Sequence, residues 1–319
     1  MIAVALVSYA LVASIVGPIV LRRGGWSTAA PRLGVLVWQG LSASIMMATV
    51  LAGAVLFVPS GPGAAPFANL LHTCVLALQR QYATPFGDET AIAGLVLTGV
   101  VLLRLGYSSA TVWRKLRRER RLLHQRLLLL AKRQPGQDEL LVIPYHQPIA
   151  YCLPGRHPEV VLTSGALACL EDDELAAVVA HERAHLRARH DIALAAATTL
   201  QRAFPFVPAF KAAAPDIARL LEMNADDAAA AATDRWALTS ALMHFAEGAG
   251  APSGTLAMTG GCTLTRAQRL AAGPQGHLGK LRNVMVLGSI VALIAAPLIL
   301  ALVPALAAFA MEYCPIPTA

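Results

Sequence analysis

Four apolar stretches, each long enough to cross a membrane, constrain this chain more than any other feature of its sequence. Residues 1–21 carry no charge, residues 34–58 follow them, a third stretch covers residues 90–113, and a fourth begins at Val284. A hydrocarbon core of about 30 Å takes roughly 20 helical residues. The composition agrees, because only 14% of the residues are charged, against about 25% in soluble domains. We therefore predict four transmembrane helices.

These stretches divide the chain into three parts. Residues 1–113 are expected to hold three transmembrane helices, at about 1–21, 34–58 and 90–113, with an outer loop at 59–89. Residues 114–282 are expected to form a basic linker and a separate domain. Residues 283–319 then provide the fourth transmembrane helix and a short outer tail.

The basic residues predict the orientation of the chain. The segment from Arg114 to Arg133 holds nine Lys or Arg and a single acid, Glu119. Cytoplasmic loops are enriched in Lys and Arg, so residues 114–282 are predicted in the cytoplasm and both termini outside. A basic block beside a span also meets anionic membrane lipid. It lacks an aromatic platform or recognition motif, so no direct nucleic-acid binding is expected.

Three features of the membrane part leave alternatives open. Arg104 lies inside the third stretch, where we expect it to snorkel or to find a partner near the span end. The segment "FPFVPAF" at 204–210 is too apolar for a free surface helix, so it either packs against the core or rests on the membrane face. Cys74 and Cys314 are predicted on the outer side, either as a disulfide or as two free thiols.

The domain between the third and fourth stretches reads as two short strands followed by helices. "QDELLVIPY" and "EVVLTSGAL" have the character of strands, and the second ends where Thr163 or Ser164 can cap a helix. Helices are expected at 172–190, at about 201–214 and at 216–248. Val160, Val161 and Leu162 are predicted as an edge strand that holds an extended substrate by β-augmentation, with a purely structural strand as the alternative.

A metal-binding pattern lies on the first of these helices, in the sequence "HERAH". Residues four apart on a helix share one face, so His181 and His185 can bind one zinc ion, with Glu182 beside it as general base and acid. Zinc then needs one more protein ligand, and Glu222 on a later helix can supply it. Asp226, four residues further, can accept the free ring N–H of a ligand histidine.

Three neighbouring residues are expected to lie away from the metal. Asp227 is a rival for the role of Asp226, but it lies one step of about 100° beyond Asp226 and so off the Glu222 face. His190 lies nine positions after His181, about 180° round the same helix, so we expect it to meet Asp191 or lipid headgroups. Asn224 is expected on the helix surface.

HExxH at 181–185 followed by ExxxD at 222–226 resembles the gluzincin membrane peptidases, of both the Ste24/HtpX type and the BlaR/MecR antibiotic-sensor type. The text "AYCLPGRHPEVVLTSGALACLEDDELAAVVAHERAHLRARHD" is similar to the BlaR/MecR type, in particular to its short actinobacterial members. Only "EYCPIPTA" follows the fourth stretch, so the penicillin-binding sensor domain of that type is expected to be absent, and with it a β-lactam trigger.

The resemblance implies a fold and an activity. The expected fold class is mainly α, a four-transmembrane-helix bundle with an inserted cytoplasmic α+β zincin domain. The expected protein is a Zn²⁺-dependent metalloendopeptidase of a bacterial cell membrane that cleaves a cytoplasmic protein, with a winged-helix repressor of the BlaI/MecI type as substrate. The alternatives are an HtpX/Ste24-like quality-control protease and a non-catalytic signal transducer with a structural zinc site. A transporter is disfavoured, because the charges do not gather at the bilayer midplane.

Overall fold

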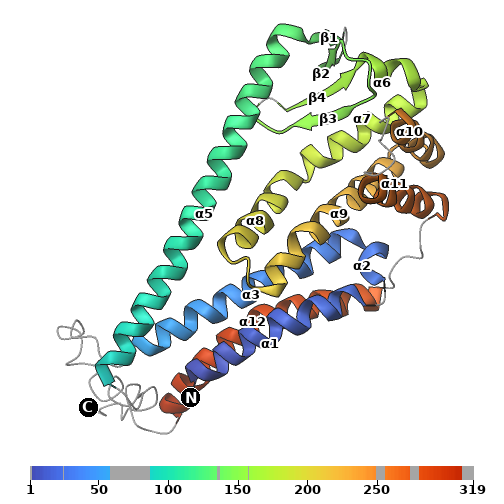
Figure 1. Cartoon of the computed structure of the whole chain (residues 1–319). Coiled ribbons are helices and arrows are strands. Elements are labelled where there is room, and N and C mark those ends of the chain that lie inside the picture. The colour runs from blue at the N-terminus through green and yellow to red at the C-terminus, as the bar shows by residue number, and fades with distance from the viewer. Residues whose placement is uncertain are drawn as a thin grey trace, which may run out of the picture.

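The computed structural model describes residues 2–23, 25–57, 87–134, 137–156, 158–248, 256–273 and 280–310. Cys74 and Cys314, and with them the predicted disulfide alternative, lie outside these residues. Within them, four helices are long and apolar enough to cross a membrane. These helices are α1 (Ile2–Arg22), α3 (Pro31–Phe57), α5 (Gly87–Leu130) and α12 (Lys280–Ala310). With the helical domain between α5 and α12, they confirm the predicted fold class (Figure 1).

Helices α1, α3 and α12 form a bundle, while α5 leans away from it (Figure 1). The short helix α2 (Trp26–Ala29) connects α1 to α3. Polar groups hold the bundle together in its interior: the Tyr9 hydroxyl lies 2.6 Å from Ser44 Oγ, and both lie within hydrogen-bond reach of the backbone oxygen of Leu293 on α12. One hydroxyl can donate to this oxygen while the other donates to its neighbour. Inside a bilayer such hydroxyl contacts join helices that hydrophobic burial alone would not bring together.

Helix α5 is longer than its predicted span. It runs unbroken through the basic segment that we expected as a linker, up to Leu130. Lys115 and Glu119 form an ion pair at i and i+4 along it, at 3.7 Å. A single rigid helix therefore carries the chain from the membrane to the sheet of the central domain.

A four-stranded sheet covers one end of the central domain. Its strands are β1 (Lys132–Gln134), β2 (Gln137–Ile143), β3 (Ala150–Leu153) and β4 (Glu159–Thr163), in the order β1-β2-β4-β3. Strand β4 pairs in parallel with β2 and antiparallel with β3. The prediction of an edge strand at Val160, Val161 and Leu162 is therefore wrong, because both edges of this buried strand are already paired. The edge on that side of the described sheet belongs to β3.

Between the sheet and α12, the described residues form six helices: α6 (Ser164–Cys169), α7 (Asp172–Arg187), α8 (His190–Ala203), α9 (Pro208–Ala230), α10 (Arg235–Gly248) and α11 (Leu256–Ala271). Thr163 caps α6 through a bond from the Ala166 amide, at 3.1 Å. A capping box of Glu171 and Glu174 starts α7.

The helix boundaries differ from the predicted ones in four places, one of which is a break at residues 231–234, between α9 and α10, inside the helix that we expected at 216–248. Helix α7 ends before His190, because Arg189 adopts a left-handed conformation with φ 50° and the chain turns there. A second turn separates α8 from α9 at residues 204–207, inside the segment that we expected to be helical from about 201 to 214. Pro215 does not end a helix, since α9 continues through it.

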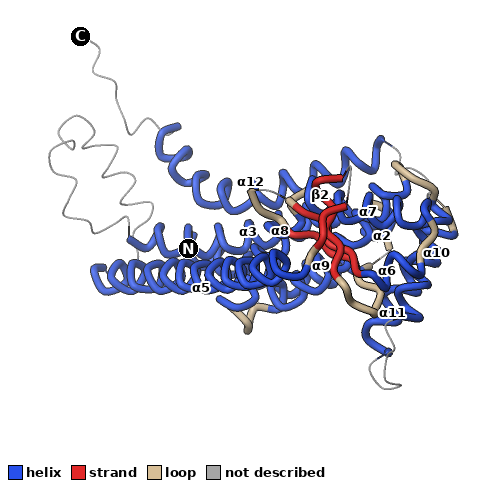
Figure 2. Tube along the Cα trace, turned by 90° about the horizontal axis from the view of Figure 1, so that it is seen from above, coloured by secondary structure: helices blue, strands red, loops and turns tan. Residues whose placement is uncertain are grey.

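Helices α8 and α9 share one hydrophobic core with the membrane bundle. They form a hairpin that lies between α5 and α3 (Figures 1 and 2). Phe204 and Phe210 of the hairpin are buried in the same cluster as Trp38 and Leu41 of α3. Of the two alternatives for "FPFVPAF", packing against the core is thus correct for these two phenylalanines. The shared core also means that the central domain is not a separate body tethered by a linker.

The crossing of α3 and α5 depends on two glycines. A Cβ at Gly94 would lie 2.9 Å from the backbone oxygen of Gly53 and 2.6 Å from Leu56 Cβ, so the helices would have to move apart. We expect Gly94→Ala to destabilise the protein in detergent by about 1–3 kcal/mol through overpacking. Gly99, on the same helix, has open space around its Cβ position, so Gly99→Ala serves as the control.

Thermal unfolding of the two variants, followed by circular dichroism, separates helix propensity from packing. Alanine favours a helix over glycine at both positions. A lower unfolding temperature for Gly94→Ala alone is the expected result, and equal shifts for both variants would contradict the close crossing.

Candidate metal centre

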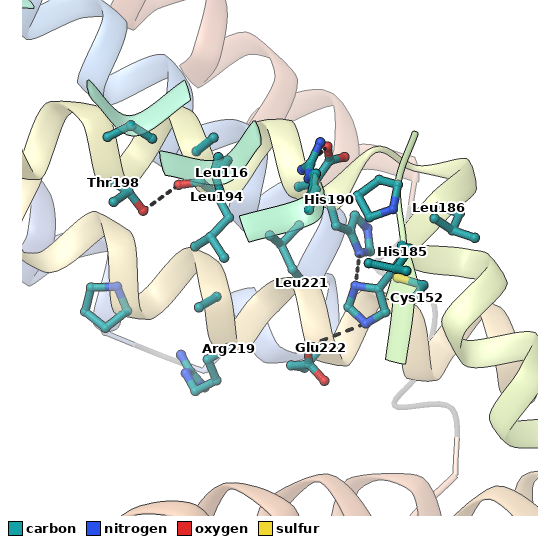
Figure 3. Close-up of a pocket in the computed structure, with 18 residues that line it drawn as sticks. Leu116, Cys152, His185, Leu186, His190, Leu194, Thr198, Arg219, Leu221 and Glu222 are labelled. Atoms are coloured by element: carbon teal, nitrogen blue, oxygen red, sulfur yellow. Dashed lines mark hydrogen bonds and ion pairs between the residues drawn. The ribbon is translucent and has the colours of Figure 1, made fainter. Parts of the chain in front are cut away.

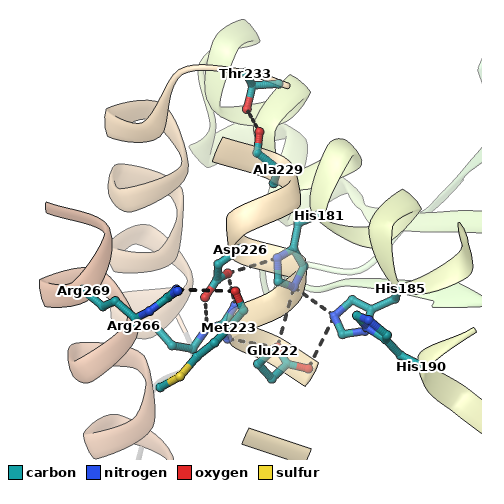
Figure 4. Close-up of polar contacts among 10 residues, drawn as sticks. All are labelled: His181, His185, His190, Glu222, Met223, Asp226, Ala229, Thr233, Arg266 and Arg269. Atoms are coloured by element: carbon teal, nitrogen blue, oxygen red, sulfur yellow. Dashed lines mark hydrogen bonds and ion pairs between the residues drawn. The ribbon is translucent and has the colours of Figure 1, made fainter. Parts of the chain in front are cut away.

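The packing of α7 against α9 brings the three predicted metal ligands together. His181, His185 and Glu222 each offer a ligand atom, and these atoms all lie within 4.8 Å of one another. His181 Nε2 is 3.6 Å from Glu222 Oε2, His185 Nε2 is 3.5 Å from Glu222 Oε1, and the two Nε2 atoms are 3.2 Å apart (Figure 4). Two imidazole nitrogens and a carboxylate are the donor set of zinc sites that keep a fourth position open.

The predicted support residue Asp226 lies behind the first histidine. His181 Nδ1 is 3.1 Å from Asp226 Oδ1, and the Asp226 side chain is buried (Figure 4). Once the Nε2 proton of His181 is lost to a metal, the Asp226 carboxylate stabilises the remaining ring proton on Nδ1, and the lone pair of Nε2 faces Glu222 and His185. The arrangement therefore fits a metal ion, because the three converging groups each offer a ligand atom on the same side.

The second histidine, His185, is supported by His190, a residue that we expected to lie away from the metal. His190 Nδ1 lies 2.9 Å from His185 Nδ1, and His190 Nε2 lies 3.0 Å from the Asn224 side-chain amide. The prediction for His190 was wrong, because it assumed one straight helix through His190. Asn224, which we expected on the helix surface, is half-buried and contacts His190. The left-handed turn at Arg189 instead starts α8 so that His190 faces back toward the site.

The chain of contacts from Asn224 can fix the tautomer of His185. If His185 Nδ1 donates to His190 Nδ1, then His190 Nε2 must donate in turn, and the acceptor is the Asn224 oxygen with its amide turned to face the ring. His185 Nε2 then carries no proton and is free to bind a metal. The opposite direction of donation would place a proton on that nitrogen.

An arginine of α11 completes the centre, and sequence spacing gave no signal for it. Arg266 binds Asp226 with two nitrogens, at 2.8 and 2.7 Å, and reaches Glu222 Oε2 at 3.1 Å. Burial acts to raise the pKa of Asp226, but the bonds from Arg266 and His181 outweigh it and hold the value at about 2. Asp227 pairs instead with Arg269, at 2.7 Å.

Glu182 lies on α7 between the two histidines and is largely enclosed. Burial raises its pKa from the ordinary range of a glutamate, with a further contribution from the charge of Glu222. The Cys152 thiol of β3 is hydrogen-bonded to it, and burial together with Glu182 raises the pKa of that thiol to about 12. Glu182 therefore remains an acceptor beside a neutral thiol, with a proton affinity shifted toward that of a general base and acid.

A cavity of about 730 Å³ adjoins the metal centre. His185, His190, Glu222 and Cys152 lie at one end of it, and it continues along α8 and α9 past Leu194 to Thr198 (Figure 3). Helix α5 contributes Val112, Leu116 and Arg120 to its wall. The lining is mainly apolar, so the site adjoins space that suits apolar side chains rather than a purely aqueous cleft.

Comparisons with known proteins agree with this site. Residues 117–214 match the model of peptidase family M48, a range that includes His181, Glu182 and His185 and ends before Glu222. The protease HtpX homolog of Salinibacter ruber is 33% identical over 129 residues, which are 37% of this chain and 46% of that protein. This chain therefore spans about half the length of that curated relative. No solved structure matches.

These matches place an M48 peptidase domain in the middle of a chain with four apolar helices. They support a membrane metallopeptidase of the HtpX/Ste24 type, for which zinc is implied by the family. Neither match concerns the BlaR/MecR type. Cleavage of a winged-helix repressor therefore stays a prediction from motif resemblance.

The protonation of His181 predicts how zinc binding depends on pH. Burial acts to lower the pKa of His181, but the contacts with Asp226 and Glu222 outweigh it and raise the value to about 9. His181 is thus protonated below that pH in the metal-free protein, and zinc must displace the proton. His185, with a pKa lowered by burial to about 4, needs no such displacement near neutral pH.

We therefore expect the apparent zinc affinity to rise by up to about tenfold per pH unit between about pH 6.5 and 8.5 and to level off above about pH 9. Competition between the full-length protein and a chelator of known pH dependence measures this slope. An affinity that stays constant across that interval would show that His181 binds zinc without losing a proton.

Proposed function

We propose that this chain is a zinc-dependent metalloendopeptidase embedded in a membrane, with His181, His185 and Glu222 as metal ligands. The convergence of their three ligand atoms within 4.8 Å, beside the largely enclosed Glu182, carries the proposal. The M48 match over residues 117–214 supports it independently, because that match does not depend on Glu222 or on the geometry of α9.

Each residue of the centre has a separate part in peptide hydrolysis. A zinc ion held by the three ligands would polarise the scissile carbonyl and acidify a water molecule. Glu182 accepts the proton of the attacking water on its carboxylate and returns it to the leaving amine. Asp226 and His190 hold the rings of His181 and His185 in the orientation that directs both Nε2 atoms to one point.

Strand β3 is the element best placed to hold a peptide. It forms an edge of the described sheet, and its residues Cys152 and Leu153 border the cavity together with His185 and Glu222. An extended substrate could pair with this edge by β-augmentation, which transfers to β3 the role that we predicted for residues 160–162. An apolar side chain next to the scissile bond would then enter the cavity.

The comparisons favour one of the predicted alternatives over the other. The HtpX homolog supports an HtpX/Ste24-like protease, which acts on proteins at the membrane, as the working description. The apolar cavity against α5 suits such a substrate, because a segment that leaves the bilayer is rich in apolar side chains. The sequence around the site, which is similar to the BlaR/MecR type, favours repressor cleavage. We also propose that the peptidase domain faces the cytoplasm, where such a repressor would lie.

Glu182→Gln separates catalysis from metal binding. We expect the variant to retain zinc, because Glu182 is not a ligand, and to lose about 10²–10⁴-fold in the rate of peptide hydrolysis, because the amide cannot accept the proton. The measurement is cleavage of an unfolded protein such as casein by the purified full chain in lipid nanodiscs, with zinc content determined in parallel.

Asp172→Asn is the matched control, since it removes an exposed carboxylate from the first turn of the same helix. It should leave both the rate and the zinc content unchanged. Full activity of Glu182→Gln would rule out Glu182 as the general base. No cleavage by the zinc-loaded wild-type protein would contradict the peptidase proposal and favour a structural zinc site in a signal transducer.

A further inference from the structure

The turn between α8 and α9 combines an apolar surface with a position beside the membrane helices. At this turn Phe204 and Phe210 are buried, while the side chain of Phe206 is 74% exposed. The rings of Phe204 and Phe206 lie 6.2 Å apart, edge to face. A large aromatic side chain exposed at the tip of a well-packed turn indicates a contact surface.

The depth of this turn can be measured along two helices. Arg22, the first charged residue after the apolar part of α1, pairs with Asp216 on α9 at 2.8 Å. From Asp216 back to Pro208 are eight residues, or about 12 Å of helix. Arg104 of α5, which reaches the turn, precedes the first residue of the basic block, Arg114, by ten residues, or about 15 Å. Both distances are close to one half of a hydrocarbon core of about 30 Å.

The side chain of Arg104 explains how the backbone of the turn can lie at such a depth. Its Nε donates to the backbone oxygen of Ala203, the last residue of α8. The amides of Phe204 and Val207 bond within the turn, to the oxygens of Leu200 and Phe204, at 2.9 and 3.1 Å. Irregular backbone is tolerated inside a bilayer only where its polar groups find such partners. The bond to Ala203 therefore gives a structural role to Arg104, a charged residue inside a span.

The neighbourhood of the turn on α5 is a lipid-exposed surface. Val100, Leu103 and Tyr107 surround Arg104 in sequence and are 54%, 75% and 69% exposed. They belong to a candidate transmembrane segment, so in a bilayer they would contact acyl chains. Phe206 follows Ala203, the residue whose backbone oxygen Arg104 binds, by three residues, so its exposed ring belongs to the turn that Arg104 holds.

Two exposed cations flank the turn on the side of the central domain. Arg202 lies in the last turn of α8 and Lys211 in the first turn of α9, and both are exposed. Each is about one helical turn from Phe206, so its long side chain can extend toward the membrane surface while the aromatic ring points inward. This is the charge pattern of elements that bind anionic lipid headgroups.

We propose that the α8–α9 turn is a re-entrant membrane anchor that enters the leaflet adjoining the central domain. Phe206 inserts between acyl chains, Arg104 caps the turn inside the bilayer, and Arg202 and Lys211 bind anionic phospholipid headgroups. The anchor is independent of the peptidase chemistry. It also positions the metal centre, because Glu222 follows Asp216 by six residues on the same helix, about 9 Å above the Arg22 level.

Photo-crosslinking of the full-length protein in lipid tests the insertion. Phe206→p-benzoylphenylalanine places a photoreactive ring at the tip, and Trp236→p-benzoylphenylalanine places it at an equally aromatic, 63% exposed position on α10. In nanodiscs of phosphatidylcholine and phosphatidylglycerol, mass spectrometry should find phospholipid adducts at position 206 and none at 236. No adduct at 206, equal adducts at both positions, or a crosslink from 206 to a second protein chain would overturn the proposal.

The headgroup contact is tested in the same nanodiscs. We expect phosphatidylglycerol to be enriched at least about twofold among the adducts at 206 relative to its share of the lipid. Combining Arg202→Gln with Lys211→Gln should abolish the enrichment. Combining Arg156→Gln with Arg187→Gln removes the same charge from exposed positions near β3 and α7 and should preserve it. Adducts in the proportion of the bulk lipid, or equal loss in both double variants, would refute specific binding of anionic headgroups.

Discussion

The contact of His181 with Asp226 is the interaction on which the remaining structure depends. It joins α7 to α9, and Arg266 binds the same carboxylate from α11, so three helices meet at one buried acid. Asp226 has no exposed surface, and removal of a partner from a buried ion pair is far more costly than loss of a surface pair. The network therefore holds the ligand helices in register and orients the first metal ligand at the same time.

A second consequence of the fold is that the peptidase domain and the membrane bundle are one body. Helices α8 and α9, which carry His190 and Glu222, bury their apolar faces against α3 and α5. A movement of the spans would thus be transmitted to a metal ligand through packed side chains. The apolar cavity lies at this junction, between α5 and the hairpin, which places the proposed substrate site where a segment leaving the bilayer would first meet the metal centre.

The sequence allowed the local parts of this arrangement to be predicted. Four apolar stretches and the i, i+4 pair of histidines depend on short-range spacing, and the structure shows four long apolar helices and brings His181, His185 and Glu222 together. The features that the sequence did not reveal depend on contacts between distant segments. Arg266 is 40 residues from Asp226, and no spacing rule connects them. His190 was misplaced because a single left-handed residue, Arg189, ends the helix. Strand β4 was taken for an edge because β3, a four-residue strand, was not foreseen as its partner.

The metal centre itself is the central claim, and X-ray absorption at the zinc edge tests it most directly. The purified full-length protein should contain about one zinc per chain, with a first shell of nitrogen and oxygen only. Glu222→Ala should lower the zinc content, while the exposed carboxylate variant Asp172→Asn should not. A first shell that contains sulfur, for which the Cys152 thiol beside Glu182 is a candidate, or a protein without zinc, would contradict the centre described above.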